Sequence, residues 1–148
     1  MIQHIELHSI LRQSVAGFYE DLVTRPTGRA VREQIERQFF DGDGTEERPP
    51  IAVIDFTGVG CLDYSCADEI VAKLLRDRVR GLVRRGMTDS HREAIEPVLE
   101  TAGLVAFAPG PDGALAPVGP GAGAEALLEE LVVRHLAARL PGGAVALT

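Results

Sequence analysis

The apolar segment at residues 51–57 constrains the fold of this chain more than any other feature. Pro49-Pro50 precede it and Thr57-Gly58 close it, so its length is that of a strand rather than of a helix. Strands that read as continuous apolar runs are typical of parallel sheets covered on both faces. The segment therefore predicts a central strand of an α/β sheet.

Polar residues follow this strand at once. Asp63, Ser65 and Asp68 are residue types that cap a helix and place negative charge near its positive end. At such strand-to-helix corners, backbone N–H groups point outward and can hold a phosphate or a carboxylate. We therefore take residues 58–66, here called the corner, as the candidate functional site.

The rest of the chain alternates between strand and helix patterns. Residues 14–23 fit either pattern, and residues 41–50 read as a mobile acidic loop rich in Gly and Pro. Pro97 should kink or split the helix in which it lies. The other predicted strands are 4–11, 81–86, 104–108 and 115–118, and the predicted helices are 27–39, 65–78, 88–103 and 124–140. This order predicts βαβ crossovers and a mixed, largely parallel sheet covered by helices.

Composition narrows the functional classes. The 148 residues suit one ordinary core, and the net charge of −7 argues against nucleic acid, whose binding depends on neutralising phosphates. No apolar stretch approaches the roughly 20 residues of a membrane span, and the first residues lack signal-peptide features, so we expect a cytoplasmic protein. Two cysteines, and two histidines spaced too loosely on a predicted strand, give no metal pattern, so we expect neither metal nor cofactor.

The segment from Val53 to Ser65 resembles the STAS domain, the module of anti-sigma-factor antagonists and of sulfate-transporter tails. Family members carry an apolar strand, a turn and an Asp-Ser-Ser-Gly type corner at a helix start. Residues 85–87 and the later stretch at 100–104 are similar to the next strand-helix unit of the family and its closing Thr-x-Gly-Leu. The resemblance implies a STAS-like domain at residues 1–108, with a hairpin and helix extension at residues 109–148.

The resemblance also implies a function: a bacterial, non-enzymatic regulatory module that binds a protein, such as an anti-sigma factor or a serine kinase. Asp63 matches the corner aspartate, and Tyr64 stands where antagonists carry the phosphorylated serine. Ser65 matches the second serine and is the better candidate for phosphorylation, ahead of Tyr64. Cys66 replaces the family glycine. We expect Asp63, Cys66, Asp68 and Glu69 to contact the partner.

A second polar helix start, at residues 87–90, should lie beside the corner, because right-handed crossovers bring both loops to one edge of the sheet. Thr88, Ser90 and His91 could then bind an anion, or a phosphate attached to the corner.

The residues leave other functions open. The polar groups of the corner could simply cap a helix and bind nothing. A small enzyme could use a Cys61 or Cys66 thiol with His91 and Asp63, or the corner could bind a small anionic ligand. The sequence also leaves open a homodimer, and whether the C-terminal helix packs on its own sheet or on a neighbour's.

Overall fold

The computed structural model describes residues 2–14, 20–40, 49–120 and 123–148. Within these residues the chain forms a five-stranded sheet in the order β1-β2-β3-β4-β5 and a two-stranded sheet of β6 and β7. The α/β class predicted from the sequence is therefore confirmed. The strands are β1 (Ile2–Glu6), β2 (Ile51–Asp55), β3 (Gly81–Arg85), β4 (Ala106–Pro109), β5 (Leu115–Val118), β6 (Ala137–Arg139) and β7 (Val145–Leu147). The helices are α1 (Leu7–Ser14), α2 (Arg25–Phe39), α3 (Tyr64–Ala67), α4 (Lys73–Asp77), α5 (Asp89–Ala102) and α6 (Ala124–Val133), with a π-helical segment, η1 (Asp68–Ala72), joining α3 to α4.

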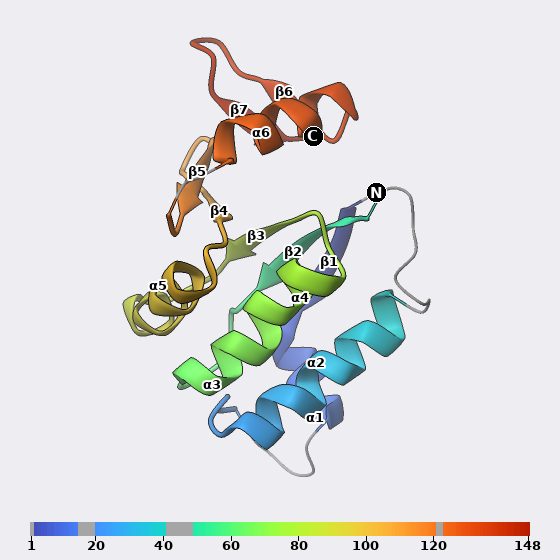
Figure 1. The fold of residues 1–148 in the computed structure, drawn as a ribbon, viewed down its shortest axis with the longest axis vertical. Coiled ribbons are helices and arrows are strands. Elements are labelled where there is room, and N and C mark those ends of the chain that lie inside the picture. The colour runs from blue at the N-terminus through green and yellow to red at the C-terminus, as the bar shows by residue number, and fades with distance from the viewer. Residues whose placement is uncertain (1, 15–19, 41–48, 121–122) are drawn as a thin grey trace.

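The order of the strands decides where the helices lie. Strands β1 to β4 run parallel, each beside its predecessor in the chain, and β5 is antiparallel to β4. In such a sheet, right-handed crossovers place every connecting helix on the same face. Ala52, Ile54 and Leu82 of the sheet accordingly share one buried cluster with residues of α1 to α5. Figure 1 shows α1 to α4 on one side of the sheet and α6 on the other.

The opposite face of the sheet, here called the second face, is covered by the C-terminal residues. Ile51, Val53, Val83 and Phe107 form a second buried cluster, together with side chains of α6, β6 and β7. The C-terminal helix therefore packs on its own sheet, which answers a question that the sequence left open.

At the N-terminus the prediction of a strand over residues 4–11 is wrong beyond Glu6. Leu7, Ile10 and Leu11 are buried and have the i, i+3, i+4 spacing of a helix, which α1 uses to pack on the first core cluster. The apparent alternation at residues 4–11 hid this spacing.

At the C-terminus the prediction of a helix over residues 124–140 is also wrong. Helix α6 stops at Val133, and His135 has a φ of 60°, a left-handed conformation that no α-helix continues. The chain then forms the β6–β7 hairpin, in which Ala137 pairs with Leu147.

Pro97 does not split its helix, one of the two outcomes that the sequence predicted, since α5 is continuous from Asp89 to Ala102. Pro97 and Glu93 both lie on the exposed side, so the Glu93 carbonyl that loses its N–H partner can bond water instead. The helix ends at Gly103 with a φ of 68°, the glycine stop expected from the sequence.

Two sequence predictions fall partly outside the described ranges: the mobile loop at 41–50, for residues 41–48, and the ambiguous segment 14–23, for residues 15–19. Within the described ranges, no helix combines the length and hydropathy that crossing a membrane requires.

Candidate functional site

The corner begins where β2 ends. The Phe56 N–H donates to the Arg85 carbonyl at 2.8 Å, which extends the pairing with β3 by one residue beyond Asp55. Gly58 then turns the chain with a φ of 89°, a conformation that favours glycine. Buried Phe56 and Val59 hold the loop on the core.

Asp63 is the polar centre of the corner. Its Oδ1 accepts from the Cys66 N–H and from the Ser65 hydroxyl, both at 2.8 Å, and its Oδ2 accepts from the Thr24 N–H at 2.9 Å. Burial raises the pKa of Asp63, but the hydrogen bonds from Cys66, Thr24 and Ser65 outweigh it and hold the pKa below the ordinary value. The carboxylate therefore caps α3 and also joins the corner to the start of α2.

The segment at residues 20–24 lies along the corner, and its contacts were not expected from the sequence. The Leu22 N–H donates to the Cys61 carbonyl at 2.7 Å, and the Asp63 N–H donates to the Leu22 carbonyl at 3.0 Å. The Gly60 N–H donates to the Glu20 carbonyl at 2.7 Å. These bonds form a short parallel bridge, so the corner and residues 20–24 form one structural unit.

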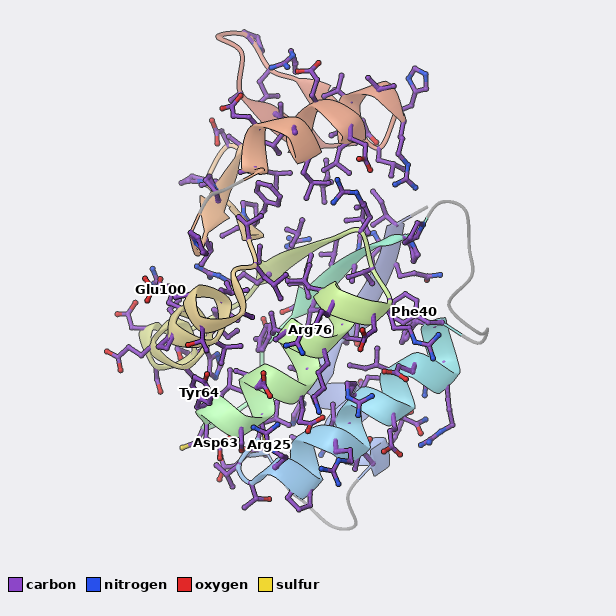
Figure 2. All side chains as sticks on the ribbon, viewed as in Figure 1. Arg25, Phe40, Asp63, Tyr64, Arg76 and Glu100 are labelled. Atoms are coloured by element: carbon purple, nitrogen blue, oxygen red, sulfur yellow. The ribbon has the colours of Figure 1, made fainter. Side chains whose placement is uncertain are left out.

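Tyr64 and Ser65, the two candidate phosphorylation sites, occupy the first turn of α3. Tyr64 is 45% exposed, and Ser65 is half-buried beside Asp63. Figure 2 shows Tyr64 and Asp63 at the exposed end of α3, with Arg25 close by. A strand that leads through the loop at residues 56–63 to an accessible helix tip is the order that the sequence predicted here.

The prediction that Cys66 contacts a partner is corrected by its burial. Its side chain is 0% exposed, and its Sγ donates to the Thr24 carbonyl at 3.1 Å. Burial, and then the Asp63 carboxylate, raise the pKa of this thiol to about 12, which opposes formation of a thiolate nucleophile. Cys61, the other thiol in the enzyme hypothesis, is exposed.

Helix α2 comes unusually close to Cys66 at Gly28. A Cβ placed on Gly28 would lie 2.8 Å from the Cys66 Cα, closer than packed carbon atoms come. In a helix, alanine is ordinarily more stabilising than glycine by ~1 kcal/mol. Here we expect overpacking to outweigh this gain, so that Gly28→Ala lowers the free energy of unfolding by about 1–2 kcal/mol.

Urea denaturation measures this effect. Glu33→Ala, on the exposed side of the same helix, is the matched control and should change the free energy of unfolding by less than about 0.5 kcal/mol. A Gly28→Ala protein more stable than the wild type would contradict the close approach of α2 to α3.

His91 was expected to bind an anion, and this prediction is corrected. The ring is 1% exposed, its Nδ1 accepts from the Thr88 N–H, and its Nε2 lies 2.7 Å from the Gly60 carbonyl, to which it donates. Thr88 is also engaged, because its hydroxyl oxygen caps the His91 N–H. Of the three residues expected to bind an anion, Ser90 alone lacks such a bond in the described structure. His91 instead fastens the loop at residues 87–90 to the corner.

A cluster of charged side chains lies beside the corner, between α2 and η1. Glu69 is fully buried, and its carboxylate accepts from Arg25 at 3.0 Å, Arg32 at 3.1 Å and Lys73 at 2.9 Å. Burial raises the pKa of Glu69, but these three cations together outweigh it and lower the pKa to about 2. Asp68 also accepts from Arg25, at 2.8 Å.

We expected Glu69 to contact a partner, but its side chain is fully buried, which corrects this prediction. Its role is to hold α2 against η1, and sequence reasoning missed this role because the cations of α2 lie about 40 positions earlier in the chain. The grouping of Arg25, Arg29 and Arg32 on one side of α2 was the signal that could have pointed to a buried acid.

In comparisons with known proteins, no family model, no curated protein and no solved structure matched this chain.

Proposed function

We propose that this protein is a non-enzymatic regulatory module of the cytoplasm, similar to anti-sigma-factor antagonists, that binds a protein partner through the corner. Phosphorylation of Ser65, with Tyr64 as the second candidate, acts as its switch. One observation carries the proposal: the Ser65 hydroxyl donates to the same carboxylate that holds the Thr24 N–H and the Cys66 N–H.

A phosphate on Ser65 would change this arrangement directly. It adds about −1.5 to −2 charges and removes the hydroxyl proton that Asp63 accepts. Two anionic groups would then lie within a few ångströms of each other, and Asp63 would turn away and release Thr24. Because residues 20–24 pair with the corner, the modification would alter the shape of the whole surface around Tyr64.

Tyr64 is the natural anchor for a partner on this surface. Among the described residues, it is one of two exposed large hydrophobic side chains, the other being Val133 on the far side of the sheet. Tyrosines are enriched among the residues that dominate binding energy in protein interfaces. Asp68, half-buried and paired with Arg25, offers a charge beside it. An anti-sigma factor or a serine kinase is the partner class that the family resemblance suggests.

Ser65→Glu tests the switch by imitating the added charge. We expect the Thr24 and Cys66 amides to exchange with solvent at least about tenfold faster in this variant, because each loses a hydrogen bond to a charged group. Hydrogen exchange followed by NMR measures these amides individually. Capture of a purified partner candidate by the immobilised protein should change in parallel.

Two variants serve as controls. Ser65→Ala keeps the Asp63 carboxylate free to hold both amides, so their exchange should stay close to wild type. Ser90→Glu puts the same charge at the corresponding position of α5, which has an exposed side chain, and should leave capture unchanged. Identical exchange and capture for Ser65→Glu and the wild type would disprove the switch.

A further inference from the structure

The second face of the sheet is only partly covered by the C-terminal helix. Leu127 of α6 lies over Gly81 and Ile51, where a Cβ on Gly81 would come within 3.2 Å of both side chains. This contact is at the start of β2 and β3. Farther along the same strands, the second face is bordered by the β4–β5 turn and the β6–β7 hairpin instead.

A cavity of about 620 Å³ lies in this second region. Ligand pockets for small molecules generally measure about 300–1,000 Å³ and are lined mostly by apolar side chains with a few polar groups. Val53 and Val83 form its almost fully buried floor, and Leu115 of the sheet with Leu140 and Leu147 of the hairpin form apolar walls. The cavity therefore has room and apolar walls for a small organic molecule.

Arg85 supplies a cation at this cavity. It is paired in register with Asp55, two residues beyond Val83 on the same face, and its side chain is exposed. Among the described residues, its guanidinium makes no hydrogen bond and no ion pair within 4 Å. Asp55 feels its charge, but the Asp55 carboxylate already accepts from the Thr57 N–H at 2.9 Å.

Two other ionisable side chains, Asp112 and His4, line the cavity, and Asp112 makes no ion pair with Arg85. The Asp112 Oδ1 is used inside the β4–β5 turn, where it accepts from the Ala114 N–H at 3.0 Å. His4 lines the wall formed by β1, and its side chain is exposed. Its imidazole is a second nitrogen-bearing side chain at the cavity, after Arg85. An arginine with open donors is well matched to a carboxylate, which it can bind through two parallel hydrogen bonds.

We propose that this cavity binds a small amphipathic carboxylate. Its apolar body lies against Leu115, Leu140 and Leu147, and its carboxylate is bound by Arg85. The site is separate from the corner, because it lies on the opposite face of the sheet, so it adds a ligand to a module proposed above to bind a protein.

Sodium octanoate is the probe that tests the site, titrated into the isotope-labelled full chain and followed by NMR. We expect shifts concentrated at the amides of Val53, Val83, Arg85 and Leu147. Arg85→Gln should weaken octanoate binding by about 10- to 100-fold, the effect of losing hydrogen bonds to a charged group. Octan-1-ol, which has the same chain without the charge, should bind wild type and Arg85→Gln within about twofold of each other.

Arg76→Gln is the matched control, since Arg76 is an exposed arginine on α4, on the other face of the sheet (Figure 2), and its loss should not alter octanoate binding. Ala146→Phe fills the cavity and should abolish binding of both probes. Should that variant fail to fold, Arg85→Gln, altered at an exposed position, decides alone. Shifts centred on Tyr64, equal octanoate affinity for wild type and Arg85→Gln, or no octanoate binding by the wild type would each overturn the proposal.

Discussion

Replacing Glu69 by glutamine should lower the free energy of unfolding at neutral pH by about 2–3 kcal/mol. The amide keeps the size of the side chain but removes the charge that pairs with Arg25, Arg32 and Lys73. Removing one partner of a fully buried ion pair costs about 3–5 kcal/mol, and the smaller value is expected here because all three cations are partly exposed and can regain water.

The same variant should change how stability depends on pH. The pKa of Glu69 is about 2 in the folded protein, below its ordinary value of 4.5, so its contribution is complete above about pH 4.5 and disappears as the pH falls towards about 2. At about 1.4 kcal/mol per pKa unit, the wild type loses about 3 kcal/mol across this interval through Glu69 alone. The difference in the free energy of unfolding between the wild type and Glu69→Gln should therefore disappear in acid.

Urea denaturation at a series of pH values measures both effects. Glu129→Gln is the control, because Glu129 pairs with Arg139 while both side chains are exposed, and such pairs contribute about 0–1 kcal/mol. Curves for the wild type and Glu69→Gln that remain parallel from neutral pH into acid would show that the Glu69 carboxylate does not hold α2 against η1.

His91→Phe is expected to lower the free energy of unfolding by about 1–3 kcal/mol. Phenylalanine fills nearly the same space and keeps the contact with Phe56, whose ring centre is 5.8 Å from that of His91. It removes both hydrogen bonds, however, and leaves the Gly60 carbonyl and the Thr88 N–H without their partner. Gly60 and Thr88 are both exposed residues that can regain water, so each lost hydrogen bond costs about 0.5–1.5 kcal/mol.

Thermal and urea denaturation measure the loss of stability. Thr88→Ala separates the capping of α5 by Thr88 from the hydrogen bonds of the His91 ring. That change removes only the cap of α5 and should cost about 1 kcal/mol. A His91→Phe protein as stable as the wild type would mean that His91 does not fasten the two loops together.

Local signals were enough to predict several elements. The strand at residues 51–57 is β2 together with the paired Phe56, and the two signals flanking α5, Thr88 as its cap and Gly103 as its end, lie where the sequence suggested. Each depends on residues within one turn or one strand, where spacing and side-chain type decide the conformation.

The errors have a different cause. The leucine stripe after residue 124 continues past Val133 without a Gly or Pro to stop it, yet the chain turns at His135 because Ala137 and Val145 pack on the second face. A helical period alone could not reveal this tertiary contact. In the corner, Asp63 could be predicted as a cap, whereas its bond to Thr24 depends on two segments 39 residues apart.

The strand order has a consequence for how the protein is made. Each strand of the main sheet pairs with strands adjacent to it in the chain, so the sheet can grow in step with synthesis. Its cover, α6, emerges only after all five strands. Until then Ile51, Val53, Val83 and Phe107 face water together, and the nascent chain is most prone to aggregate in that interval.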